Sequence, residues 1–288
     1  MKEQTDTWIR AAEAAWLEPL REHVSGIFTG TILPSHDQTH HARVWRHGKM
    51  VLGELAGRGI PVDRSLAEGV LVASWFHDTG MAIDRGKVHG RLGKEMCQDF
   101  FSGQGLPRPA LYDKVMAAIE FHDRKGMDGH PGFTPGNPPG IAEILSVADD
   151  LDALGTIGIY RYTEIYLLRG IPVQKLGTSV LENAYNRYRN MAVSCSLLPE
   201  LSAIIRDRYD RLCSFFNCFN QQLLTVRSPE EVWSGHLGVV NHIRRLSVEG
   251  KTRPEDFPQS LGNLHSGSTV ISFFNNLKNE LEKESLDL

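Results

Sequence analysis

The sequence predicts an all-α fold, and three observations support this prediction. Apolar residues recur at helical spacing through most of the 288 residues. Runs that alternate apolar and polar residues, which are typical of half-buried strands, are scarce. The alternation of strands and helices that builds a parallel sheet is not seen either, so we expect helices alone.

Short polar residues, glycine and proline separate the predicted helices. Ser35 or Asp37 could cap the helix that follows them, Asp63 begins another, and Gly80 breaks the chain shortly afterwards. The expected helices span 6–27, 38–58, 64–77, 88–103, 107–122, from 141 through the Asp149 region, 159–169, 175–193, 199–224, 229–247 and 268–284.

One loop stands out by its composition. Residues 126–140 contain five Gly and four Pro, which is unfavourable for any regular element. The loop separates two candidate site residues, His122 and Asp149, in the sequence. It is therefore either a lid over a substrate or a surface connector.

Length and composition indicate an ordinary globular protein. The chain is 41% hydrophobic with a net charge of −4, which gives no bias toward nucleic acid or anionic membranes. No apolar segment is long enough to span a membrane, and the polar N-terminus has no signal-peptide pattern, so we expect a cytoplasmic protein. The four cysteines form no CxxC pair and are expected to be reduced and mostly buried.

Histidines and aspartates form the most informative pattern, because imidazole and carboxylate groups hold divalent transition metals. Neighbouring side chains within a helix diverge by about 100°, so adjacent His77 and Asp78 can meet at one ion only where a helix ends. A His-Asp pair alone is weak support, since 36–37 and 122–123 are also His-Asp. The candidates are His36, His40, His41, His77, Asp78, His89, His122 and Asp149.

Three separated motifs contain several of these candidates. They are His-His-Ala-Arg-Val at 40–44, Phe-His-Asp-Thr-Gly at 76–80, and Val-Ala-Asp-Asp-Leu-Asp-Ala-Leu-Gly at 147–155. Together they resemble the HD superfamily of metal-dependent phosphohydrolases. Their order and spacing also fit that superfamily, and the resemblance covers roughly residues 30–165. It implies an all-α HD-domain core over 1–165, with a helical extension over 166–288 packed on it.

The resemblance also implies a ligand set and a bridging residue. It implies one or two divalent transition metal ions, with Fe or Mn expected before Ni, Co, Zn or Mg. It also implies that Asp78 bridges the two ions and that His77 and Asp78 are the catalytic residues. Spacing alone does not choose among Asp149, Asp150 and Asp152, and many relatives have Lys or Arg at position 150. We expect His36 and Asp152 to support the site and His41 not to bind metal. The implied ligands are His40, His77, Asp78, His89, His122 and Asp149.

The activity implied is hydrolysis of a phosphate ester or anhydride of a nucleotide or other small phosphorylated metabolite by metal-activated water. Two alternatives stay open, namely a mixed-valent diiron oxygenase of the same superfamily and a non-catalytic regulatory module. A phosphate needs positive charge nearby. The candidate cations are Arg43, Lys87, Arg91, Arg124, Lys125 and Arg161.

The extension is less informative. Tyr160, Tyr162 and Tyr166 either line the substrate pocket or pack the junction with the core. Cys213 and the phenylalanines at 215, 216 and 219 are either core or the contact surface of a homodimer.

Overall fold

The computed structural model describes residues 2–31, 33–103, 105–123, 133–261 and 267–285. Within these ranges the regular structure is helical, apart from one isolated bridge between Thr134 and Asn137, so the predicted all-α fold is confirmed. The chain divides into two compact units. The first comprises Met1–Thr31, His36–Leu151 and Asn190–Ile204, and the second comprises Ile32–Ser35, Asp152–Arg189 and Ile205–Leu288. Whether a core over 1–165 folds separately from the rest stays a prediction.

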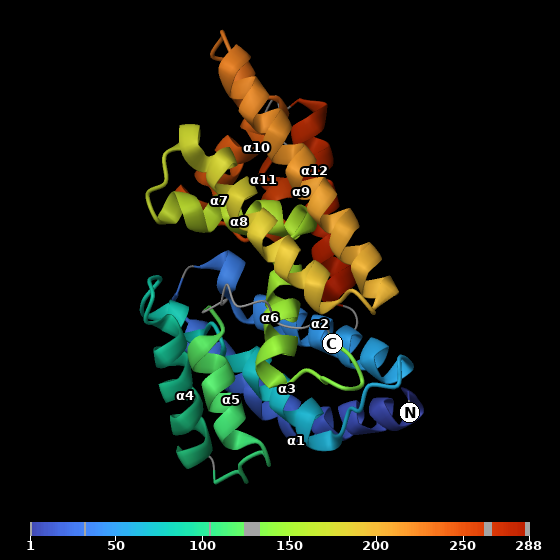
Figure 1. Cartoon of the computed structure of the whole chain (residues 1–288). Coiled ribbons are helices and arrows are strands. Elements are labelled where there is room, and N and C mark those ends of the chain that lie inside the picture. The colour runs from blue at the N-terminus through green and yellow to red at the C-terminus, as the bar shows by residue number, and fades with distance from the viewer. Residues whose placement is uncertain (1, 32, 104, 124–132, 262–266, 286–288) are drawn as a thin grey trace. The chain divides into compact units, whose positions relative to one another are not determined.

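Helix α3 is the centre of the first unit (Figure 1). It is buried continuously from Ala67 to Phe76 and packs against α1, α2, α4 and α5. A helix that is apolar on every side is stable only when other elements surround it. The helices of this unit are α1 (Lys2–Phe28), α2 (Gln38–Gly57), α3 (Arg64–Phe76), α4 (His89–Gly103), α5 (Tyr112–Phe121) and α6 (Ile141–Asp152).

The helix boundaries follow local chemistry where capping residues are present. The side chain of Asp37 accepts a hydrogen bond from the Thr39 N–H at 2.9 Å, and that of Asp63 accepts one from Leu66 N–H at 2.7 Å. These two caps start α2 and α3 as predicted. Helix α5 begins at Tyr112, later than the predicted 107, because the prolines at 107 and 109 disfavour helical backbone before them.

Three glycines bring α4 close to its neighbours. A Cβ on Gly80 would lie 2.0 Å from the carbonyl oxygen of His89, and one on Gly90 would lie 2.7 Å from that of Glu120. Gly93 meets the Phe76 carbonyl in the same way, at 2.6 Å. The prediction that Gly80 provides a backbone break needs correction. Its φ is not in the left-handed region, α3 already ends at Phe76, and glycine is required there for close packing.

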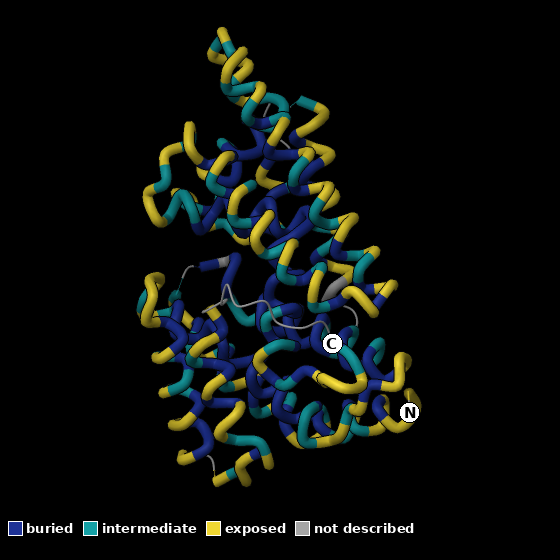
Figure 2. The backbone as a smooth tube through the Cα atoms, viewed as in Figure 1, coloured by how far each residue is buried: buried dark blue, intermediate teal, exposed yellow. Residues whose placement is uncertain are grey.

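The second unit is also helical, with buried stretches along its helices that are dark blue in Figure 2. Several of its largest buried side chains are aromatic. Phe216, Phe219, Phe257 and Phe274 are fully buried, which places the phenylalanine cluster around 215–219 in a core. Its elements are α7 (Gly155–Leu168), α8 (Val173–Ser194), α9 (Pro199–Thr225), α10 (Gly235–Ile243), α11 (Phe257–Leu261) and α12 (Ser268–Ser285), with the C-terminal end of α8 and the N-terminal end of α9 in the first unit.

The single helix predicted over 229–247 is wrong. The segment forms a 3-10 turn at Glu231–Trp233, then α10, then a π-helical turn at Arg244–Glu249. Gly235, with φ of +60°, redirects the chain between the first two. No described helix is both long enough and apolar enough to cross a membrane. All four cysteines are free, two of them buried and two half-buried.

Candidate metal centre

The six predicted ligands meet in two buried groups in the first unit. Within each group, one candidate ligand atom per residue lies within 4.8 Å of all the others. Asp78 belongs to both groups and so links them. The first group is His40, His77, Asp78 and Asp149, and the second is Asp78, His89 and His122.

The ends of helices position most of these side chains. His77 and His122 are the C-terminal caps of α3 and α5, and His89 is the first residue of α4. Asp78 follows with φ of −106° and ψ of 7°, outside the helix. Neighbouring His77 and Asp78 converge because the chain leaves the helix between them, as the sequence indicated.

The first group has the dimensions of a coordination sphere. His40 Nε2 and His77 Nε2 lie 3.1 Å apart, and Asp78 Oδ2 lies 3.3 Å and 3.5 Å from them. Asp149 Oδ1 lies 3.8 Å from both nitrogens. Two atoms about 2.1 Å from one ion are about 3.0 Å apart at a right angle and about 3.4 Å apart at the tetrahedral angle. The observed spacings therefore suit four ligands of one ion.

The second group uses the other oxygen of Asp78. Asp78 Oδ1 lies 3.0 Å from His122 Nε2 and 3.4 Å from His89 Nε2, and these two nitrogens are 3.2 Å apart. Each oxygen of one carboxylate thus faces a different pair of imidazoles. This is the arrangement expected of a carboxylate that bridges two ions.

Backbone carbonyls fix the orientation of three imidazole rings. The Nδ1 atoms lie 3.0 Å from Ser74 O for His77, 2.5 Å from Gly86 O for His89, and 2.8 Å from Ile119 O for His122. Since a carbonyl only accepts, each Nδ1 carries the proton and each Nε2 is left to bind a metal. When His89 and His122 are neutral, the lone pairs of their Nε2 atoms point at each other. A cation between the two nitrogens would bind both lone pairs, so this arrangement fits a metal site.

The protonation of the cluster differs between its two sides. Burial lowers the pKa of His77, although Asp78 and Asp149 oppose the change. Burial also disfavours the charged form of His89, but the carboxylates of Asp123 and Asp78 outweigh it and raise its pKa to about 11. The pKa of His122 is raised against burial by Asp78 in the same way. In the metal-free protein, the second group thus favours protonated imidazole, whereas burial favours the neutral form of His77.

Asp123 is a residue that the sequence analysis missed. Its Oδ2 lies 2.9 Å from His89 Nε2 and its Oδ1 lies 3.5 Å from His122 Nε2. Burial would raise the pKa of Asp123, but the contact with His89 outweighs burial and lowers it. The 122–123 pair was set aside as a chance dipeptide. A usable signal was available, because both 76–78 and 121–123 read Phe-His-Asp.

The three aspartates of the third motif have different surroundings. Asp149 joins the first group, whereas the carboxylate of Asp152 accepts a hydrogen bond at 2.9 Å from buried Arg161 in the second unit. Asp150 is buried and does not belong to either group.

Two further histidines lie beside the first group. The ring of His36 packs against that of His40, with centroids 5.6 Å apart. His41 Nδ1 lies 3.3 Å from Ser74 O, the carbonyl that also orients His77. Burial, followed by the nearby His77 and His40, holds the pKa of His41 well below its usual value, so His41 packs as a neutral ring.

The structure does not gather the proposed substrate-binding cations into one patch. Arg43 is buried and donates to Thr39 Oγ1 at 3.1 Å. Lys87 and Arg91 are exposed on either side of His89, and Arg91 pairs with Glu95 at 2.6 Å. Arg161 donates to Asp152 and to the Ser35 carbonyl. Arg124 and Lys125 lie outside the described residues, so their role stays a prediction.

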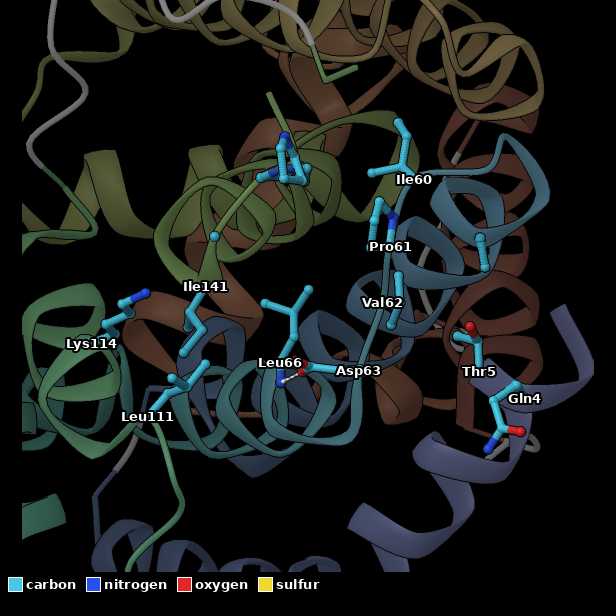
Figure 3. Close-up of a pocket in the computed structure, with 14 residues that line it drawn as sticks. Gln4, Thr5, Ile60, Pro61, Val62, Asp63, Leu66, Leu111, Lys114 and Ile141 are labelled. Atoms are coloured by element: carbon cyan, nitrogen blue, oxygen red, sulfur yellow. Dashed lines mark hydrogen bonds between the residues drawn. The ribbon is translucent and has the colours of Figure 1, made fainter. Parts of the chain in front are cut away.

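The Gly/Pro loop is described only from residue 133 onward, and its earlier part lies outside the described residues. Phe133 is buried, and its N–H donates to Ser194 O at 2.9 Å. Residues 138–140 line a largely apolar cavity of about 500 Å³ near the N-terminal ends of α3, α5 and α6, where Leu66, Leu111 and Ile141 approach one another (Figure 3). The cavity contains none of the candidate ligands, and His77, His122 and Asp149 lie toward the opposite, C-terminal ends of these helices.

Comparisons with protein-family models, with curated proteins and with solved structures found no match for the chain. The resemblance to the HD superfamily therefore rests on the three motifs and on a buried histidine–aspartate cluster that is compatible with an HD-type site.

Proposed function

We propose that the protein is a metal-dependent phosphohydrolase of the HD type, with two ions bridged by Asp78. The observation that carries the proposal is that the two oxygens of the Asp78 carboxylate face different pairs of histidines. Oδ2 faces His40 and His77, whereas Oδ1 faces His89 and His122. Two ions about 3.5–4 Å apart suit in-line displacement at phosphorus, because they stabilise the attacking and the leaving oxygen.

The chain's own residues hold the reacting groups in place. A divalent ion held here would supply Lewis acidity and would lower the pKa of a bound water toward neutrality. Asp78 fixes the separation of the two positions. The bonds from imidazole Nδ1 to backbone carbonyls hold the Nε2 atoms of His77, His89 and His122 in place. These rings need not reorient when an ion binds, which favours a preorganised site.

The second group reaches solvent at Asp123, so a small substrate can approach it from that side. The side chain of Asp123 is 53% exposed while it contacts the second group, whereas those of Asp78 and Asp149 are 9% and 8% exposed. Lys87 and Arg91 are exposed on either side of His89 and carry positive charge on this same stretch of chain. Of the two, Lys87 is the better candidate for a phosphate contact, because Arg91 is paired with Glu95 at 2.6 Å.

The test is hydrolysis of a panel of nucleotides, phosphomonoesters and pyrophosphates by the protein loaded with Mn²⁺ or Fe²⁺. We expect release of phosphate or pyrophosphate that EDTA abolishes and added metal restores. Asp78→Asn should lose this turnover and keep its far-ultraviolet circular dichroism. Asp99→Asn, an exposed aspartate of α4, is the matched control and should retain turnover.

The same assay separates the alternatives. A hydrolase turns over at the same rate with and without dioxygen, whereas a diiron oxygenase stops under anaerobic conditions. A regulatory module would bind metal and hydrolyse nothing in the panel. Dioxygen-dependent turnover, or metal binding without any turnover, would refute the hydrolase proposal.

A further inference from the structure

Two Phe-His-Asp tripeptides, at 76–78 and 121–123, have the same local geometry. Each phenylalanine is the last residue of a helix, α3 or α5, and each histidine is the C-terminal cap. The backbone angles agree, with φ and ψ of −53° and −43° at His77 and −57° and −32° at His122. Each histidine also donates its Nδ1–H to the carbonyl three residues earlier. The two tripeptides therefore present the imidazole Nε2 in the same manner, and an aspartate follows each histidine.

His89 lies between the aspartates of these two tripeptides. Its Nε2 is 2.9 Å from Asp123 Oδ2 and 3.4 Å from Asp78 Oδ1. His122 Nε2 is 3.0 Å from Asp78 Oδ1 and 3.5 Å from Asp123 Oδ1. Close packing of Gly80 on His89 and of Gly90 on Glu120 keeps the start of α4 in this place. The four side chains thus border one small region.

Adding Asp123 makes the two groups chemically equal. The first group has two imidazoles and two carboxylates, namely His40, His77, Asp78 and Asp149. The second group has two imidazoles and only the shared carboxylate. Asp123 contacts both imidazoles but lies outside the group as defined by mutual distances, so it would complete the set on the side away from Asp78. Four protein ligands occupy most of the coordination sphere of a transition metal and leave places for water and substrate.

We infer that Asp123 is the fourth protein ligand of the second metal position, so that 122–123 is a second ligand doublet opposite 77–78. The inference rests on the two-ion centre proposed above and adds a ligand beyond the six that the motifs imply. With Asp78 and Asp149 alone, two divalent ions keep a net charge of two. Adding the carboxylate of Asp123 lowers that net charge to one. Because Asp123 is half exposed, the second position is the one that exchanges its ion with solvent more readily.

A simple ion pair between Asp123 and protonated His89 would give the same metal-free distances. The substitution Asp123→Asn separates the two roles, because it keeps the shape of the side chain and removes the charge that strengthens metal coordination. The protein is loaded with Mn²⁺, desalted and analysed for bound metal by mass spectrometry. Electron paramagnetic resonance on the same samples distinguishes a coupled pair of ions from a single ion. Neither measurement depends on activity.

We expect two ions per chain with a coupled spectrum in the wild type, and one ion with a six-line spectrum in Asp123→Asn and Asp123→Ala. Asp99→Asn should retain two. Two coupled ions in both Asp123 variants would overturn this inference and leave the proposed hydrolase intact. One ion in the wild type would also overturn it, since there would be no second position. A wild type that binds no metal would overturn the inference and the metal centre together.

Discussion

The Nε2 atoms of His40 and His77 lie 3.1 Å apart with no exposure of either side chain to solvent. His77 donates its Nδ1–H to Ser74 O and has a lowered pKa, so its Nε2 offers a lone pair. The carboxylates of Asp78 and Asp149 face the same space. Burying these carboxylates costs free energy that nearby positive charge offsets, and a divalent ion brings more charge than a proton does. This cluster is therefore expected to gain stability from metal.

Asp149 and Asp152 should respond differently to the change to asparagine. Asp149→Asn removes a ligand and should abolish most of the stabilisation by Mn²⁺, which for a free ion at a thousand times its Kd is about 4 kcal/mol. Asp152→Asn breaks a buried ion pair with Arg161 and should lower the free energy of unfolding by about 3–5 kcal/mol.

Urea unfolding in EDTA and in Mn²⁺ measures both effects. The free energy of unfolding of Asp152→Asn should be lower than that of the wild type in both conditions. The gain in this free energy on adding Mn²⁺ should equal that of the wild type. If Asp152→Asn lost the response to Mn²⁺ while Asp149→Asn kept it, the ligand assignment within this motif would be wrong.

Gly80→Ala should destabilise the protein and weaken the second metal position. The added Cβ would meet the carbonyl oxygen of His89 at 2.0 Å, so the start of α4 must move away from the turn at Gly80 and carry His89 with it. Overpacking of this kind costs about 1–3 kcal/mol. Unfolding in urea and the retention of Mn²⁺ after desalting are the measurements.

Gly53→Ala is the matched control for this substitution. Gly53 lies within α2, and no heavy atom lies within 4 Å of its added Cβ. The control should be stabilised by about 0.5–1 kcal/mol, since glycine is unfavourable inside a helix. Equal stability of Gly80→Ala and the wild type would contradict the close packing described for α4.

The raised pKa of His89 predicts how the metal-free protein responds to pH. Its value of about 11 lies above the ordinary 6.5, so the folded protein binds a proton that the unfolded chain releases between these two values. The stabilisation from His89 is complete below pH 6.5 and is lost as the pH rises toward 11. Metal binding at neutral pH should correspondingly release protons from His89 and from His122, whose pKa is also raised.

Titration calorimetry with Mn²⁺ in buffers of different ionisation enthalpy measures the protons released. We expect release by the wild type at pH 7 and less release by His89→Gln. An equal heat of binding in all buffers would show that no proton leaves, against the protonation assigned to the second group.

The parts of the site that could be predicted are those with a local signature. Asp37 and Asp63 cap helices through hydrogen bonds to residues two or three positions later in the chain. The motifs around residues 40, 77 and 149 occur in a recognisable order. The convergence of His77 and Asp78 follows from the end of a helix alone. Such features depend only on residues that are close together in the sequence, so a single sequence is enough to predict them.

The parts that could not be predicted depend on contacts between distant segments. The repeated Phe-His-Asp tripeptide is the one local signal for Asp123, and the contact with His89 exists only because α4 places that residue beside it. Arg161 is directed to Asp152 and to Ser35, which lies 126 residues earlier in the chain. The close approach at Gly80 likewise depends on the backbone of another segment. Helical periodicity contains no information about these pairings.

The most direct test of the metal centre is anomalous diffraction from crystals of the protein soaked with Mn²⁺. We expect two anomalous peaks on either side of Asp78, one among His40, His77 and Asp149 and the other beside His89 and His122, about 3.5–4 Å apart. Crystals in which these side chains keep their places and no peak appears among them would contradict the account.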